Sequence, residues 1–134
     1  MKKLKYVFDS YALLAYLGDE PGADEVEALL RRAEVGETVI HLSLINLGEI
    51  AYITERRYGT KRLREVLSAL TQLPLQILEA SWERVIAAAH IKACHAISYA
   101  DAFAIALAEE KEALVVTGDP QFKKVEHLVQ VIWL

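Results

Sequence analysis

The amino-acid sequence predicts an α/β fold: a three-layer α/β/α sandwich with a central parallel sheet. Short apolar runs alternate with longer segments of helical periodicity along the chain. The apolar runs are almost uninterrupted, as they are in parallel strands that helices cover on both faces. No linker, internal repeat or low-complexity stretch divides the 134 residues, so a single domain over 1–134 is expected.

Each secondary-structure element is predicted from a local pattern. Five apolar runs are expected to form strands, at residues 4–8, 38–42, 75–78, 113–117 and 128–133. Six segments with one apolar face are expected to form helices, at about 11–17, 23–35, 44–58, 60–73, 82–94 and 99–112. Helix N-caps are expected at Ser43, Ser81 and Ser98. Ligands of such sheets bind beyond the carboxyl ends of the strands, so the residues that follow strands are the first candidates for a site.

Charge and cysteine content restrict the class of function. The net charge of −4 argues against a protein that holds nucleic acid by bulk positive charge, although an acidic metal site would itself lower the charge. Cys94 is the single cysteine, so we expect no internal disulfide and a reducing, cytoplasmic location. No apolar run approaches the length of a membrane span, and no membrane partner is expected.

The apolar content favours a further buried surface. The hydrophobic share of 54% exceeds the average, and a subunit interface is one place for the excess. We therefore predict a homodimer, with candidate contacts in the first helix at Tyr11, Leu14, Tyr16 and Leu17.

Two aspartates directly follow predicted strands. Asp9 comes after the run 4–8, and Asp119 follows the run 113–117 within Gly118-Asp119-Pro120. Each has a structural interpretation, since Asp9 suits a helix N-cap and Gly-Asp-Pro suits a turn. The alternative is that both present a carboxylate at the carboxyl edge of the sheet.

Two further acids lie on helical faces that are otherwise apolar. Glu49 stands one turn after Ile45 and one turn before Ile53, where a surface glutamate is not expected. Asp101 fits a capping box with Ser98, but its face continues with apolar residues: Ala104, Ile105 and Ala108. An unpaired charge on a buried face is costly, so either a buried ion pair or a bound cation is expected to compensate each acid.

Together the four acids predict a divalent metal site, with Asp9, Glu49, Asp101 and Asp119 as metal ligands and catalytic residues. No lysine or arginine is patterned to match them. Carboxylates that share a site repel one another, and they do not all stay ionised unless a divalent cation joins them. Hard oxygen ligands suit Mg²⁺ or Mn²⁺, ions that activate water and stabilise a leaving oxygen in phosphoryl chemistry.

The same residues carry a resemblance to a known family. PIN-domain proteins have acidic motifs that resemble, in order and spacing, four segments of this chain: YVFDSYALLAYL, LINLGEIAY, ISYADAFAIALA and VVTGDPQF. The likeness is closest to the VapC-type toxin ribonucleases of VapBC toxin–antitoxin pairs, and it covers nearly the whole chain. It implies an Mg²⁺- or Mn²⁺-dependent endoribonuclease that acts on RNA, forms a dimer and is held inactive by a cognate antitoxin protein.

On this resemblance the four acids correspond to the acidic quartet of the family. Ser10 and Thr117 correspond to hydroxyl residues that support the quartet. Two positions depart from the pattern: Gly118 stands where many members have asparagine, and Tyr11 is bulkier than the small residue expected there. Glycine in place of asparagine at position 118 removes a polar contact but no carboxylate.

A group of cations brackets Tyr58 at the break between two predicted helices. The structural interpretation is a solvated face. The functional interpretation is that phosphates of RNA bind there while Tyr58 stacks on a base. The residues predicted to bind RNA are Arg56, Arg57, Lys61 and Arg62.

Other classes of function fit the sequence less well. A phosphoacceptor receiver domain would have two acids at the end of the first strand, where Phe8-Asp9-Ser10 has one. A zinc site at His90, Cys94 and His95 lacks a second thiol and an evident fourth ligand. A dinucleotide-binding enzyme would need a glycine-rich loop after the first strand. A catalytically inactive PIN-like module that binds RNA or protein stays open as the alternative.

Overall fold

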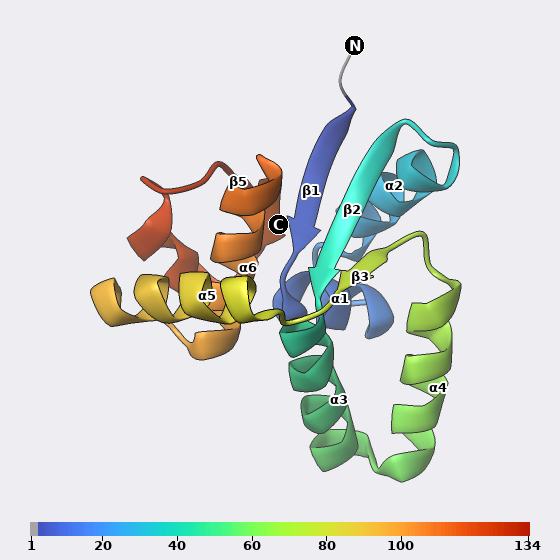
Figure 1. The fold of residues 1–134 in the computed structure, drawn as a ribbon. Coiled ribbons are helices and arrows are strands. Elements are labelled where there is room, and N and C mark those ends of the chain that lie inside the picture. Colours follow the sequence, from blue (N-terminus) through green and yellow to red (C-terminus); the bar gives the residue numbers. More distant parts are fainter. Residues whose placement is uncertain (1–2) are drawn as a thin grey trace.

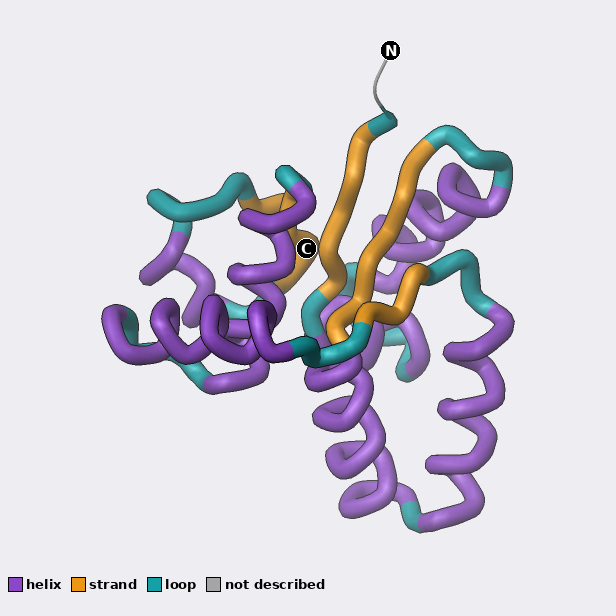
Figure 2. Tube along the Cα trace, viewed as in Figure 1, coloured by secondary structure: helices purple, strands orange, loops and turns teal. Residues whose placement is uncertain are grey.

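The computed structural model describes residues 3–134, and a five-stranded parallel sheet lies at its centre (Figures 1 and 2). Its strands are β1 (Leu4–Phe8), β2 (Thr38–Ser43), β3 (Gln76–Leu78), β4 (Leu114–Thr117) and β5 (Val131–Trp133). Their spatial order is β3-β2-β1-β4-β5, so the chain builds outward from β1 in both directions. The switch point therefore falls between β1 and β4. The predicted α/β fold with a central parallel sheet is confirmed.

Within residues 3–134 the helices surround this sheet. They are α1 (Ser10–Leu17), α2 (Ala23–Glu34), α3 (Leu44–Tyr58), α4 (Thr60–Gln72), α5 (Trp82–Cys94), α6 (Tyr99–Lys111) and the 3₁₀ helix η1 (Pro120–Val125). The predicted N-caps are confirmed, because the Oγ atoms of Ser43, Ser81 and Ser98 accept hydrogen bonds from backbone N–H groups at the start of α3, α5 and α6.

The predicted boundaries need two corrections near the C-terminus. The last strand begins at Val131, three residues later than the apolar pattern predicts. The turn expected at Gly118-Asp119-Pro120 is followed by a 3₁₀ helix over Pro120–Val125 that the sequence pattern does not predict. Local residues explain why this 3₁₀ helix forms. Asp119 caps the helix, and Pro120 is a first helical residue whose backbone has no N–H group that needs a partner.

Two apolar clusters lie on opposite faces of the sheet. Val7 belongs to the cluster formed with α5 and α6, whereas its neighbour Phe8 belongs to the cluster formed with α1 to α4. This alternation follows from the two-residue period of a strand. Helix α6 is buried at every position from Asp101 to Ala108, so the first turn of a core helix carries one of the predicted site acids.

The apolar character of α5 and α6 belongs to this core. Among the residues that the structure describes, no single helix is long and apolar enough to span a membrane. Only α5 and α6 taken together meet the length and composition, and they are bent by 116° at the break between them.

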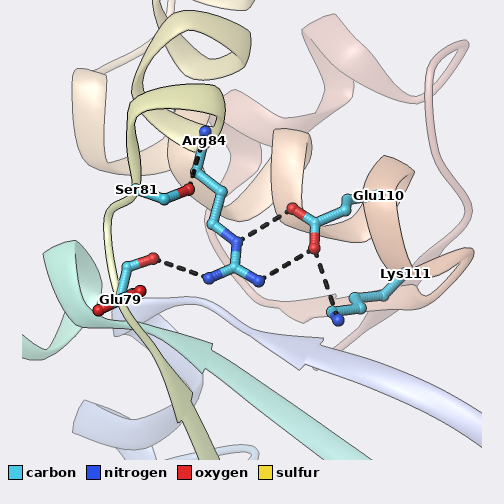
Figure 3. A network of polar contacts seen from close by, with 5 residues as sticks. All are labelled: Glu79, Ser81, Arg84, Glu110 and Lys111. Atoms are coloured by element: carbon cyan, nitrogen blue, oxygen red, sulfur yellow. Dashed lines mark hydrogen bonds and ion pairs between the residues drawn. The ribbon is translucent and has the colours of Figure 1, made fainter.

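An arginine fixes the start of α5 to the end of α6 (Figure 3). The Arg84 guanidinium donates through Nε and Nη2 to the two carboxylate oxygens of Glu110, at 3.0 and 3.1 Å. Its Nη1 donates to the carbonyl oxygen of Glu79 at 2.9 Å. This bidentate contact lowers the pKa of Glu110 and raises that of Arg84. The pair joins the first turn of α5 to the last turn of α6.

Candidate active site

An acid-lined cavity lies at the carboxyl edge of the sheet, beside the switch point. Strands β1 and β4 end at Phe8 and Thr117, and Asp9 and Asp119 follow these ends. The cavity has a volume of about 670 Å³, and all four predicted acids contribute to its wall: Asp9, Glu49, Asp101 and Asp119. Residues from four separate parts of the sequence are thus brought together as the sequence predicts.

Asp9 is both a helix cap and a cavity residue. The backbone N–H of Ala12 donates to its Oδ1 at 2.9 Å, and the hydroxyl of Thr117 donates to its Oδ2. Only 1% of Asp9 is exposed. Burial raises its pKa to about 7, and the charges of Asp101 and Asp119 add to the rise against the two hydrogen bonds. The structural and functional interpretations of Asp9 are therefore compatible.

Asp101 lies in the first turn of α6. Its backbone N–H donates to Ser98 Oγ at 3.1 Å, so the predicted cap is present. Burial raises its pKa to about 6, and the charges of Asp119 and Glu49 add to the rise, although hydrogen bonding with Ser98 opposes it. The charge of Asp119 thus contributes to the raised pKa of both Asp9 and Asp101, so these carboxylates share one electrostatic environment.

Asp119 and Glu49 lie at the more accessible side of the cavity, and both are half-buried. Asp119 Oδ1 accepts a hydrogen bond of 2.9 Å from the backbone N–H of Gln121, and so caps η1. For Glu49, the prediction of a position within an inward-facing apolar stripe is only partly right, because Ile45, Glu49 and Ile53 are all half-buried. The fully buried stripe of α3 consists of Asn46, Ile50 and Thr54, and Glu49 stands at its edge, facing the cavity.

The two predicted supporting hydroxyls make different contacts. Thr117 is fully buried at the end of β4. Its Oγ1 accepts from the backbone N–H of Asp119 at 3.0 Å while its hydroxyl donates to Asp9, so it joins the two acids that follow strands. Ser10 lies next to Asp9, and its hydroxyl donates to the carbonyl oxygen of Asn46 at 3.3 Å.

Asn46 is a residue that sequence reasoning missed. It is fully buried, and its Nδ2 donates to Ser10 Oγ at 3.1 Å and to the carbonyl oxygen of Ala100 at 3.3 Å. It therefore binds the residue after Asp9 and the residue before Asp101. Its Oδ1 has no hydrogen-bond partner among residues 3–134. The available signal was its place three residues before Glu49 as the only asparagine of the chain.

The donor set fits a divalent cation. None of the four acids forms an ion pair within the described part of the chain. Lys92 also lines the cavity, but its Nζ donates to the carbonyl oxygen of Ile97 at 2.7 Å. In residues 3–134 no three His, Cys, Asp or Glu side chains approach closely enough to hold an ion as they stand. Mg²⁺ keeps several waters and takes one or two carboxylates directly, so an acid-lined cavity of this size suits the hydrated ion.

The cations predicted to bind RNA lie at the other end of α3. The α3–α4 hairpin extends away from the sheet in Figure 1. Arg56 lies over the ring of Tyr52, 5.3 Å from the guanidinium carbon to the ring centroid. Arg62 contacts Glu65 at 3.3 Å and donates to the carbonyl oxygen of Leu17 at 3.1 Å, so it also holds α4 against α1. With a rise of about 1.5 Å per residue, Arg56 lies roughly 10 Å beyond Glu49 along the helix.

The fold and the cavity together define a class of protein. Ligands of parallel α/β sheets bind at the switch point, and carboxylates at that place are oxygen ligands of the kind that Mg²⁺ and Mn²⁺ prefer. The profile of the PIN domain matches residues 6–128 of this chain. The chain therefore belongs to the PIN-domain family, whose fold is typical of nucleases.

Solved structures of VapC toxins share this fold at low sequence identity. VapBC2 from Rickettsia felis, bound to a DNA fragment from its promoter, is 17% identical with a TM-score of 0.76, over 96% of this chain and 98% of that chain. VapC20 from Mycobacterium tuberculosis, a toxin that cleaves the sarcin–ricin loop, is 17% identical with a TM-score of 0.70, over 90% and 94%. VapBC-1 from nontypeable Haemophilus influenzae is 15% identical with a TM-score of 0.70, over 97% and 98%. A comparison with curated protein sequences gives no match.

Proposed function

We propose that this protein is an Mg²⁺- or Mn²⁺-dependent endoribonuclease and the toxin of a toxin–antitoxin pair. The observation that carries the proposal is the convergence of four carboxylates on one cavity, none of which forms an ion pair within residues 3–134. Membership of the PIN-domain family and the fold shared with VapC toxins support it. The alternative is a catalytically inactive PIN-like module that binds RNA or protein.

Asp9, Glu49, Asp101 and Asp119 would hold the ion. When bound, it supplies a nucleophilic water and stabilises negative charge on the leaving oxygen of the phosphodiester. The chain itself orients the ligands. Thr117 and the N–H of Ala12 fix the Asp9 carboxylate, while Asn46 ties together the helix starts that carry Asp9 and Asp101.

The partners proposed for this chain follow the same chemistry. An uncompensated group of carboxylates binds a guanidinium well, because arginine can bridge two carboxylate oxygens in a bidentate way. We therefore propose an antitoxin that inserts an arginine into the cavity. Relatives of the fold have been crystallised as toxin–antitoxin complexes, among them one from Klebsiella pneumoniae. A homodimer and a cytoplasmic location complete the proposal, with Arg56, Arg57, Lys61 and Arg62 as phosphate contacts.

The experiment is an RNA-cleavage assay on purified variants in the presence of Mg²⁺. Asp101→Asn and Glu49→Gln should each lower the cleavage rate by more than about 100-fold. Removal of a metal ligand should lower the rate further than removal of a residue that only supports a ligand. Asp24→Asn is the matched control, because Asp24 is an exposed acid on α2. Full activity in both acid variants contradicts the site. A wild-type protein that binds RNA without cleaving it supports the inactive module instead.

A further inference from the structure

We propose that a nucleobase of the RNA stacks on Tyr11 at the edge of the acid cavity, and that residue 118 is glycine because the Tyr11 ring occupies the space of a side chain there. The inference rests on the proposed function, since it names a substrate contact of the same site. It concerns the two positions at which the chain departs from the motifs that it otherwise resembles.

The ring of Tyr11 lies unusually close to the backbone of Gly118. A Cβ atom added to Gly118 would lie 2.3 Å from Cε1, 2.6 Å from Cζ and 2.9 Å from Oη of Tyr11. Real Cβ atoms essentially never have contacts under 3.0 Å, so any side chain at position 118 would displace the ring. Gly118 is not among the glycines with positive φ. Its backbone conformation is therefore open to other residues, and the missing side chain is what the position requires.

This contact joins the two segments that carry the acids following strands, and it places an aromatic ring in the wall of the cavity that these acids line. Tyr11 is two residues after Asp9, and Gly118 directly precedes Asp119. The ring lines the cavity, and 41% of the residue is exposed. A large aromatic side chain held by a backbone contact on one side, and open to a cavity on the other, is ready to receive a flat ligand.

A nucleobase is the part of the substrate that suits this position. The cavity is acidic, so it attracts the phosphates of RNA only through a bound cation. Stacking of a base on an aromatic ring does not depend on charge, and single-stranded RNA offers such bases. Apolar side chains extend the wall of the same cavity: Leu14, Ile53 and Ile97.

Steady-state kinetics on a single-stranded RNA with Mg²⁺ measure how much the Tyr11 ring contributes to substrate binding, apart from the contribution of the metal-binding acids. Tyr11→Ala should raise KM by about 5- to 150-fold, the range given by loss of one base–aromatic stack, with little change in kcat. Tyr11→Phe, which keeps the ring, should behave like the wild type. Trp82→Ala is the control, because Trp82 is 79% exposed and is not among the residues that line the cavity. An abasic oligomer used as competitor should bind the wild type and Tyr11→Ala equally.

A double-mutant cycle tests the role of Gly118. Gly118→Ala should raise KM as much as Tyr11→Ala does, because its Cβ displaces the ring. In the Tyr11→Ala background the same change should have no further effect, and thermal unfolding should show every variant to be folded. An unchanged KM in Tyr11→Ala, or effects of the two changes that multiply, would overturn the inference.

Two other outcomes identify what failed. If Tyr11→Ala converts a dimer to a monomer by light scattering and KM rises only with that change, Tyr11 belongs to a subunit interface and the inference is wrong. If the wild type does not cleave RNA, the proposed function fails. The inference is then judged by fluorescence anisotropy of labelled RNA, where Tyr11→Ala must still weaken binding.

Discussion

Replacement of Asp9 by asparagine should stabilise the protein without metal, although Asp9 is almost completely buried and caps a helix. Asparagine is as good an N-cap as aspartate, and its side-chain oxygen can still accept from Ala12 or Thr117. What Asp9→Asn removes is the cost of ionising a carboxylate in a buried place among other acids. The pKa of Asp9 gives the size of that cost.

The pKa rises from 3.8 to about 7, a difference of about 3 units. At 1.36 kcal/mol per unit this corresponds to about 4 kcal/mol as an upper limit. Part of this will be offset because the amide loses a charge-assisted hydrogen bond, so we expect a gain of about 1–3 kcal/mol at pH 8. For a domain of this size each kcal/mol raises Tm by roughly 4 °C.

The sign of the pH dependence is determined by which state binds the proton. Between pH 3.8 and about 7 the folded protein holds a proton on Asp9 that the unfolded chain has released. The stability that this proton contributes is complete at low pH and is lost as the pH rises through the folded pKa. The difference between Asp9→Asn and wild type should therefore be small near pH 4 and largest near pH 8. Asp101, whose pKa is about 6, adds a similar slope to both proteins.

The assay is thermal unfolding from pH 4 to 8 in the presence of a chelator, with Asp24→Asn as the exposed control. The difference in Tm between Asp9→Asn and wild type should grow with pH. The difference in Tm between Asp24→Asn and wild type should stay nearly constant. If Asp9→Asn is less stable than wild type at pH 8, the carboxylate of Asp9 stabilises the fold as a helix cap, and its burial does not destabilise the protein.

Three further predictions follow from the same geometry. Mg²⁺ at about 100 times its dissociation constant should stabilise the wild type by roughly 2.7 kcal/mol, and an equal shift in the melting of Asp9→Asn would place the ion elsewhere. Asn46→Leu should lower the free energy of unfolding by about 1–3 kcal/mol and also weaken metal binding in calorimetry; an unchanged affinity would reduce Asn46 to a packing residue. If an antitoxin that co-purifies with this chain inhibits RNA cleavage, replacing every arginine of that antitoxin should relieve the inhibition, and inhibition that survives would show that the partner blocks RNA access instead.

Much of the fold could be predicted because its signals are local. The uninterrupted apolar runs gave the strands, and serine caps marked the starts of α3, α5 and α6. Two of the four acids were found because a residue that follows a parallel strand must lie at one edge of the sheet. Glu49 was found through a pattern that was only partly right, since α3 is rotated so that Asn46 and Ile50 are buried and Glu49 is at the edge.

The remaining features depend on contacts between distant parts of the chain. The hydrogen bond from Thr117 to Asp9 joins residues 108 positions apart. The Tyr11–Gly118 contact is of the same kind: each residue looks like an isolated departure from the motif, and only the structure shows that one makes room for the other. Asn46 was missed because a buried amide on a helix has no periodic signature, and its partners Ser10 and Ala100 lie on other helices.

The source of the oxygen in the cleaved RNA tests the central claim most directly. Under the proposed function a metal-activated water would attack phosphorus, so cleavage in water labelled with heavy oxygen should place one labelled atom in the terminal phosphate of the product, as seen by mass spectrometry. Chelator or Asp101→Asn should abolish both the cleavage and the label. A 2′,3′-cyclic phosphate without solvent oxygen, or labelled product that persists with chelator, would contradict a metal-dependent hydrolysis in this cavity.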